Sequence, residues 1–264
     1  MGKTGRSSIS GAVLKVIACV SMLIDHFSVI VLWNYIQKSA AAGGQNAQLE
    51  HIYHVGRAIG RIAFVLFAYL IVEGFLHTRS RGKFLLRLGV FALISEIPYD
   101  LAFGGQCFDW SSQNVFFTLF LGVTALTVWE WIGKYAGEWC QCIAVVVCGL
   151  AAYYMKTDYL YTGVLLIFVL YLMHDIRLVY KMAVAAVVLL LGTWSMNCLR
   201  YGESFSIKYL FRFSLREMYG IAAFFPIALY DGSRGRQLPK WFWYGFYPAH
   251  ILLLYGIAGF MRVL

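Results

Sequence analysis

The sequence predicts an all-α fold, a polytopic transmembrane helical bundle of about nine to ten helices that forms a single domain over residues 1–264. Of its 264 residues, 61% are hydrophobic, 17% aromatic and only 13% charged, whereas soluble domains are about half apolar and about a quarter charged. The mean hydropathy is +0.68. Because a bilayer-spanning helix needs about 20 apolar residues, the composition excludes a water-soluble globule and leaves no room for a soluble domain.

The expected helices follow from apolar runs separated by short polar loops. The first run, 12–33, resembles a signal peptide, but a secretory core is only about 7 to 15 residues long. Because this run is longer and contains Asp25, we expect a retained helix, followed by a loop over 37–51. Pro98 is expected to kink or break the third helix, because proline lacks an amide hydrogen. The remaining helices are expected at 55–76, 84–103, 115–132, 143–155, 160–173, 182–198, 219–230 and 241–263.

The positive charge of the chain points to membrane orientation. A net charge of +9 could suggest a nucleic-acid partner, but the Lys and Arg residues gather in short inter-helix loops, as the positive-inside rule predicts. We therefore expect no nucleic acid, a lipid bilayer of the bacterial cytoplasmic membrane as the surroundings, and a cytoplasmic N-terminus. The basic segment 199–217 falls on the expected outer side. It is either a miscounted or partly embedded helix, or an interfacial helix or basic pocket for an anion.

The six cysteines carry no expected chemistry. They include no CxxC pair and mostly lie inside apolar runs, where a buried thiol usually packs as a small hydrophobe. We expect neither a disulfide nor a metal site.

Ionisable residues inside the expected helices are the main sign of function. Each costs about 2.5 to 3.5 kcal/mol at the bilayer centre and usually faces a partner or a water-filled cavity. Asp25 and His26 lie past the middle of the first helix, about 100° apart around its axis, so they cannot stack on each other. His26 shares a stripe with Lys15 and Met22. The Asp-His pair either fixes helix packing or takes part in proton transfer, since histidine titrates near neutrality.

The second and third helices carry further charges. Arg57 could reach the membrane surface with its long side chain. Arg61 lies deeper and needs an anion, and the candidates are Asp25, Glu96 and a substrate phosphate. Glu96 shares a face with Asp100 beside Pro98. Two such carboxylates repel unless one is protonated or a cation lies nearby, so they are either functional or serve as a cap or a bridge to a basic residue. Glu73 and His77 share a face at the end of the second helix.

Polar residues also mark the fourth and the last helix. Asn114 opens the fourth helix, where its amide either caps the helix or holds a carbonyl oxygen. Tyr247 and His250 share a face beside Pro248 and bring a second histidine into the membrane. Asp158 is expected to cap the helix that follows it.

Long motifs occur in a fixed order along most of the chain. They are LKVIA at 14–18 with MLIDH at 22–26, GRIAF at 60–64 with LFA at 66–68, EGF at 73–75 with HTR at 77–79, RL at 87–88 with FALISEIPY at 91–99, QNVFFTL at 113–119 and YPAH at 247–250. Together they resemble the TraX family of integral membrane acetyltransferases. Val65 departs from the family pattern, in which proline is expected at this place in the arginine motif.

The resemblance implies transfer of an acetyl group from acetyl-CoA, the co-substrate, to an amine or hydroxyl of a pilin-like peptide or a cell-envelope glycan. His26 would act as general base and Asp25 would orient its imidazole. The tetrahedral oxyanion would be stabilised by Arg61, Asn114 or Tyr247, and the phosphates of the coenzyme by the basic turn of Arg79, Arg81 and Lys83. The expected substrate-binding or acetyl-CoA-binding residues are Lys15, Arg61, Glu73, His77, Arg79, Glu96, Asn114, Tyr247 and His250.

Two other functional classes would also need embedded charges. A proton-coupled secondary transporter uses buried Asp, Glu and His, but the chain has no internal repeat of the kind that many such transporters show. A structural membrane subunit would pack its charges against a partner chain. The sequence defines neither the acceptor nor the oligomeric state.

Overall fold

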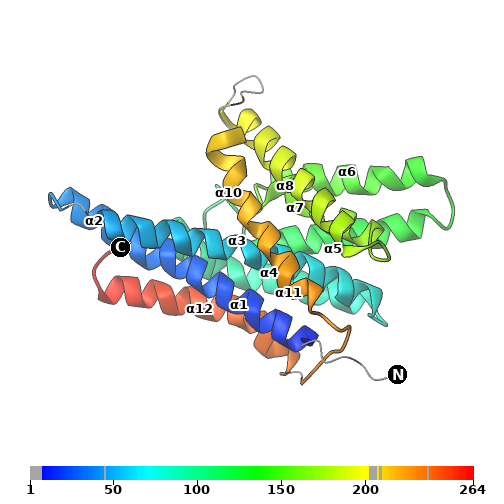
Figure 1. Cartoon of the computed structure of the whole chain (residues 1–264), viewed down its shortest axis with the longest axis horizontal. Coiled ribbons are helices and arrows are strands. Elements are labelled where there is room, and N and C mark those ends of the chain that lie inside the picture. The colour runs from blue at the N-terminus through cyan, green and yellow to red at the C-terminus, as the bar shows by residue number, and fades with distance from the viewer. Residues whose placement is uncertain (1–7, 45, 202–206, 208–209, 237) are drawn as a thin grey trace.

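The computed structural model confirms the all-α prediction (Figure 1). It describes residues 8–44, 46–201, 207, 210–236 and 238–264, and in these ranges there is no β-strand, only two isolated bridges. The helical elements are α1 (Gly11–Phe27), η1 (Ser28–Trp33), α2 (Asn34–Ala41), α3 (Ala47–Leu76), α4 (Arg81–Phe103), α5 (Val115–Ile132), α6 (Glu138–Tyr154), α7 (Leu160–Leu172), α8 (Leu178–Tyr201), η2 (Leu210–Ser214), α10 (Leu215–Glu217), η3 (Met218–Ala223), α11 (Phe224–Ala228) and α12 (Lys240–Phe260).

Several of these helices are built to cross a membrane. Four helical segments of the described chain are long and apolar enough to do so: Gly11–Ala41, Ala47–Leu76, Val115–Ile132 and Leu178–Leu199. The helix α3 is about 45 Å long at 1.5 Å per residue, whereas the hydrocarbon core is about 30 Å thick. Its ends therefore reach past the hydrocarbon unless it is tilted. The chain is a membrane protein.

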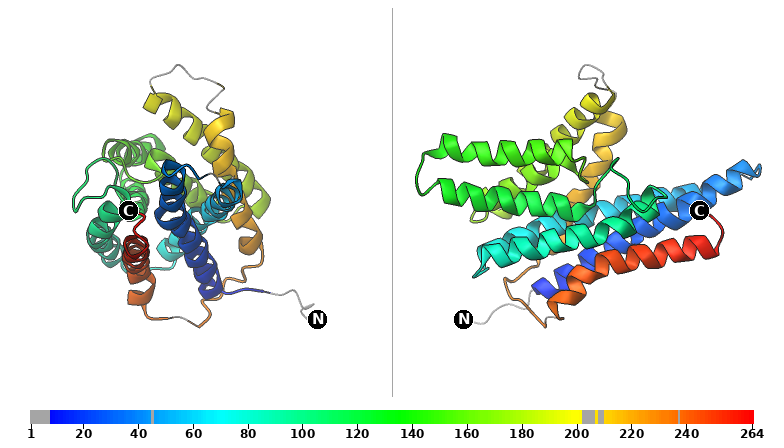
Figure 2. Two further views of the ribbon diagram at one scale, coloured as in Figure 1. Left: turned by 90° about the vertical axis from the view of Figure 1, so that its left-hand side faces the viewer. Right: turned by 180° about the vertical axis from the view of Figure 1, so that it is seen from behind.

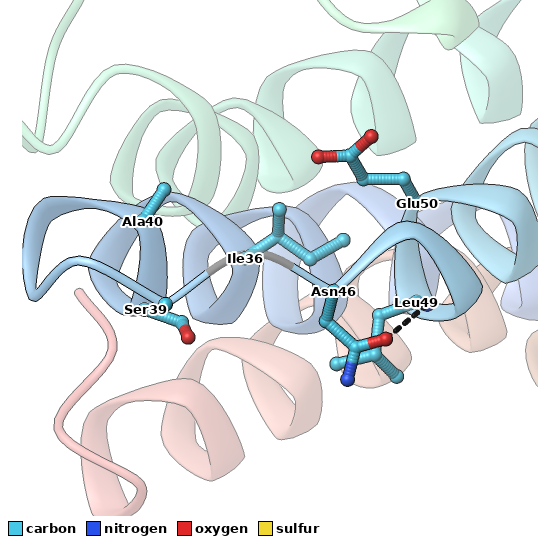
Figure 3. A pocket seen from close by; sticks show the side chains of 7 residues that line it. Ile36, Ser39, Ala40, Asn46, Leu49 and Glu50 are labelled. Carbon is cyan, nitrogen blue, oxygen red and sulfur yellow. Dashed lines mark hydrogen bonds between the residues drawn. The ribbon is translucent and has the colours of Figure 1, made fainter.

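The expected loop over 37–51 is wrong. The first helix continues through the π-helical η1 into α2, so that only residues 42–46 connect it to α3. Alanine-rich sequence at the end of α2 favours helix, and the Asn46 side chain caps α3 by accepting a hydrogen bond from the Leu49 amide at 3.1 Å. A cavity of about 110 Å³ lies beside this turn, and Figure 3 shows side chains that line it. Small-molecule sites usually exceed about 300 Å³, so the cavity is a feature of turn packing.

Three other helices begin earlier than predicted. The helix α4 begins at Arg81 and continues through Pro98 to its predicted end at Phe103, so of the expected kink or break the break does not occur. The end of α4 is held because the buried Asp100 carboxylate accepts a hydrogen bond from the Asp109 amide at 2.9 Å. The helices α6 and α8 begin at Glu138 and Leu178, before the predicted starts, because the residues ahead of each predicted apolar run continue the helix.

The segment 199–217 is partly helical. Lys208, one of its basic residues, lies outside the described residues. From Leu210 the chain forms one irregular return helix made of η2, α10, η3 and α11. For 210–217 the segment is therefore the start of a helix that was predicted to begin only at residue 219.

The helices α1 and α3 approach each other at two glycines four residues apart. A Cβ atom on Gly60 would lie only 2.1–2.3 Å from the side chain of Asp25, and one on Gly56 would lie 2.0 Å from Ser28 Oγ. Small residues at this spacing let membrane helices pack closely. The contact presses Asp25 against the α3 backbone.

Gly60→Ala is therefore expected to destabilise the protein. The new methyl group would overlap the Cβ and Cγ atoms of Asp25, so α1 and α3 must separate, at a cost of about 1–3 kcal/mol. The measurement is the thermal unfolding midpoint of purified protein in detergent. The matched control is Gly256→Ala on α12, where nothing lies within 4 Å of the new Cβ. Equal midpoints for the two variants would contradict the packing argument.

Basic residues gather at one end of the bundle, which we call the basic end. The helices α1, α4 and α12 begin there, and α3, α5 and α11 end there. The amide of Gly11 bonds to Ser233 O at 2.8 Å, which ties the start of α1 to the loop after α11, and Figure 2 shows both segments at the same end. The basic end carries Arg79, Arg81, Lys83, Lys134, Arg177, Lys181, Arg234, Arg236 and Lys240.

Candidate active site

The two embedded histidines meet between α1 and α12. His26 Nδ1 lies 2.6 Å from His250 Nε2, and the rings are nearly coplanar, at 3°. The ring centres are 4.9 Å apart, which is about the nitrogen-to-nitrogen distance plus the distance from each nitrogen to its own ring centre. The imidazoles therefore lie end to end in one plane, which is the geometry of a straight N–H···N hydrogen bond.

The direction of this hydrogen bond follows from a carbonyl group. His250 Nδ1 lies 2.7 Å from Phe246 O, and a carbonyl oxygen can only accept, so His250 Nδ1 carries the proton. In the neutral ring His250 Nε2 is then an acceptor, and His26 Nδ1 must donate to it. We assign the tautomers on this basis. The remaining nitrogen, His26 Nε2, has no hydrogen-bond partner among the described residues, so its lone pair can take up a proton.

Aromatic residues enclose the histidine pair. The rings of Phe103 and Tyr247 each lie 5.7 Å from the His26 ring, edge to face. Tyr247 is buried, and its ring lies 5.4 Å from the ring of Phe116 in the first turn of α5. Its phenol O–H is a hydrogen-bond donor. A phenol next to a base and close to a helix N-terminus is well placed to stabilise a developing negative charge.

Asp25 does not contact the imidazole of His26 in the way that the sequence predicted. Its carboxylate pairs with Arg57 at 2.7 Å, so Arg57 is an ion-pair partner and not a surface-directed side chain. Because successive helical residues point about 100° apart, Asp25 faces α3 while His26 faces α12. The group that holds His26 in place is His250.

Arg61 pairs with a residue that the sequence did not single out. Its guanidinium lies 3.0 Å from Glu217 Oε1 and 3.4 Å from the Tyr159 hydroxyl, and neither Asp25 nor Glu96 pairs with it. Both side chains of the ion pair are mostly buried, at 17% and 15% exposed. Asp25 and Asp158 also act on Arg61 electrostatically. A charged network therefore joins α1, α3, α10 and the loop before α7.

That loop has a strained backbone. Tyr159 and Leu160 have φ values of +62° and +44°, which non-glycine residues rarely adopt, and such strain often accompanies function. The loop is held in place because Thr118 bonds to Thr157 Oγ1 at 3.0 Å and to Asp158 O. The expectation that Asp158 caps α7 is wrong, since the N-cap position is Tyr159 and has no side-chain cap bond.

Glu96 and Asp100 have separate partners. Asn114 is fully buried and caps α5, as predicted, by accepting from the Phe116 amide at 3.0 Å. The Asn114 amide nitrogen donates to Ala92 O at 2.8 Å and to Glu96 Oε2. The Asn114–Glu96 contact ties α5 to α4, whereas Asp100 bonds the loop after α4.

Asn114→Asp is expected to lower the free energy of unfolding by about 1–3 kcal/mol, because an acceptor would then face the Glu96 carboxylate in place of a donor. The second variant Asn114→Asp/Glu96→Gln restores a donor and an acceptor in reversed positions and should recover the part of the loss that comes from the Glu96 contact, while the bond to Ala92 O stays lost. Unfolding midpoints of both variants in detergent test this. A double variant no more stable than the single one would contradict the assigned contact.

The other predicted binding residues lie toward the basic end. Lys15 is eleven residues before His26 on α1, about 16 Å along the axis. Glu73, His77 and Arg79 lie at the end of α3 or just after it. Arg81 in the same turn pairs with Glu130. In the described part of the chain, no group of three or more His, Cys, Asp or Glu side chains is placed to hold a metal ion.

Known proteins match this sequence at two levels. The family model described as "TraX protein" matches residues 10–258. A probable fimbrial assembly protein, FimC of serogroup H1, from Dichelobacter nodosus is 31% identical over 122 residues, which are 44% of this chain and 44% of that protein. The match thus spans less than half the length of this curated relative. No solved structure matches the chain.

Proposed function

Because this chain belongs to the TraX family, we propose that it is a membrane-embedded acetyltransferase that moves an acetyl group from acetyl-CoA to an amine or hydroxyl. The observation that carries the proposal is the His26–His250 pair. Its hydrogen-bond order leaves His26 Nε2 unprotonated inside a membrane protein, and an oriented histidine is the side chain most often used for proton transfer at neutral pH.

The proposed reaction uses this base directly. His26 Nε2 takes a proton from the amine or hydroxyl of the acceptor, whose nitrogen or oxygen attacks the thioester carbonyl. The new bond to carbon forms, the carbon–sulfur bond breaks, and the coenzyme sulfur receives the proton back from His26. The Tyr247 hydroxyl stabilises the tetrahedral oxyanion. The protonated His26 ring is stabilised by His250, because His26 Nδ1–H donates a hydrogen bond to the lone pair of His250 Nε2.

We place the basic end in the cytoplasm of a bacterial cell, with the N-terminus on the same side, because Lys and Arg favour the cytoplasmic side of the membrane. His26 lies fifteen residues after the start of α1, about 22 Å along the axis. Since the hydrocarbon core is about 30 Å thick, His26 is closer to the outer surface. The acceptor is then expected to arrive from outside and acetyl-CoA from the cytoplasm.

The acceptor is proposed to be a pilin-like peptide or a cell-envelope glycan. The printed name of the Dichelobacter nodosus relative concerns fimbrial assembly, which favours the pilin-like peptide. An amine acceptor would give an amide and a glycan hydroxyl would give an ester. Base treatment of the product separates the two, because esters hydrolyse readily and amides do not.

The proposal is tested with purified protein in sealed vesicles that receive acetyl-CoA labelled in the acetyl group. In the vesicles, labelled acetyl should appear in an acceptor and the free thiol of the coenzyme should accumulate. In cells with and without the gene, mass spectrometry of envelope fractions should show acetylated products that depend on the gene. Flux of an unmodified solute coupled to protons, without thioester cleavage, would instead identify a secondary transporter and refute the acetyltransferase.

A further inference from the structure

Three basic residues come together at the basic end of the α1–α12 contact. Lys15 of α1 lies within electrostatic reach of Arg234, in the loop after α11, and of Lys240, the first residue of α12. Lys15 Nζ also lies 5.5 Å above the ring of Trp243. The Ser233 side chain and the Ser233 amide, which donates to the nearby carboxylate of Asp231 at 2.8 Å, hold the pKa of Asp231 below its usual value. The cluster concentrates positive charge, which attracts anions.

A groove lies beside this cluster. It has a volume of about 290 Å³ and lies between the start of α1 and the start of α12. Its walls are largely apolar, from Val13, Val16 and Leu238, with Trp243 at one side and Arg236 at the edge. This volume is just below the usual range of small-molecule sites, about 300–1,000 Å³, and the groove needs to hold only the adenine ring. The groove fits a planar heterocycle, with the cations of the cluster beside it for phosphate groups.

Two parallel helices connect the cluster to the histidine pair. On α1, Lys15 precedes His26 by eleven residues, and on α12 Lys240 precedes His250 by ten. At 1.5 Å per residue these distances are about 16 Å and about 15 Å. Figure 1 shows α1 and α12 side by side. Both helices thus carry a cation near the basic end and a histidine the same distance further on.

This distance is close to the reach of the arm of coenzyme A. About twelve bonds separate the diphosphate oxygen from the sulfur, and at a peptide-like reach of about 3.5 Å per three bonds the arm extends about 14 Å. A coenzyme held by its phosphates at the cluster would bring its thioester to His26. The turn of Arg79, Arg81 and Lys83 lacks this connection, because it joins α3 to α4 and Arg81 is engaged by Glu130.

We propose that Lys15, Arg234 and Lys240 bind the phosphates of acyl-CoA, that the groove at Trp243 binds its adenine ring, and that the pantetheine arm lies along the α1–α12 contact. The proposal rests on the acetyltransferase function proposed above. The acetyl group would then reach the outer half of the membrane while the nucleotide stays at the basic end. An anionic lipid headgroup has the same phosphate chemistry and is the occupant to be distinguished.

The test compares two double variants that each remove one Arg and one Lys from the basic end. Arg234→Ala/Lys240→Ala removes two cations of the cluster, and Lys134→Ala/Arg177→Ala removes two exposed cations of other turns. The dissociation constant of coenzyme A is measured by equilibrium dialysis in nanodiscs of phosphatidylcholine. We expect it to rise at least tenfold in the first variant and to stay within twofold of wild type in the second.

The outcomes separate this site from the proposed function. Unchanged affinity of the cluster variant for coenzyme A overturns the site, even if wild type transfers acetyl. Tenfold weaker binding supports the site, even if no acceptor is ever acetylated. In nanodiscs with phosphatidylglycerol, lipid retention that falls only in the cluster variant, with unchanged coenzyme affinity, would assign the cluster to lipid. Acetyl-pantetheine, which lacks the nucleotide, should be used equally by wild type and the cluster variant.

Discussion

Replacing His26 by alanine is expected to lower kcat for acetyl transfer by roughly 100- to 10,000-fold, the range that a positioned general base contributes. His26 Nε2 is the lone pair that the hydrogen-bond chain leaves free, because His26 Nδ1 donates to His250 and His250 Nδ1 donates to Phe246 O. The measurement is the initial rate with labelled acetyl-CoA, normalised to folded protein. A variant that retains more than a tenth of the wild-type rate would remove His26 from the mechanism.

The role of His250 is tested by what replaces it. His250→Asn keeps an oxygen that can accept the His26 Nδ1 proton, whereas His250→Phe keeps a ring but no acceptor. If His250 positions the base, kcat should fall more in the phenylalanine variant than in the asparagine variant, and KM for acetyl-CoA should change little in either. Equal kcat values in two folded variants would mean that His250 only packs the helices.

The sequence identified both members of the histidine pair but not their contact. Embedded charges are costly, so His26 and His250 stood out without any structure. The orienting role of Asp25 was expected from the family resemblance, although the two residues lie about 100° apart around the helix axis. Which helix each residue faces depends on packing, and the close approach of Gly60 places Asp25 against α3.

Glu217 and Tyr159 could not have been assigned from sequence pattern. Glu217 lies where a π-helical and a short α-helical stretch give way to a 3-10 helix, and hydrophobic periodicity assumes a regular helix. Its one visible signal was an acid at the edge of an apolar run within a basic segment. Tyr159 reaches Arg61 from a left-handed backbone position that tertiary contacts impose. The long apolar helices were predictable because length and composition alone define them.

Glu217→Ala is expected to lower the free energy of unfolding by about 3–5 kcal/mol, because it leaves the Arg61 guanidinium buried without its carboxylate. The two groups are 3.0 Å apart and mostly buried, and the only other hydrogen bond that the described residues give Arg61 is the longer one to Tyr159. Denaturation in mixed micelles measures the loss. Glu217→Gln, which keeps the shape and an acceptor oxygen, should lose less.

The double variant Arg61→Met/Glu217→Met decides what the ion pair does. Replacing both partners of a buried pair by apolar residues is often neutral or stabilising, so the double variant should unfold near wild type. If Arg61 only braces α3 against the return helix, its acetyl transfer should also stay within about threefold of wild type. If Arg61 instead holds the oxyanion, the stable double variant should lose roughly 100- to 1,000-fold in kcat. Because its guanidinium is directed to Glu217 and Tyr159 and not toward His26, we expect the first result.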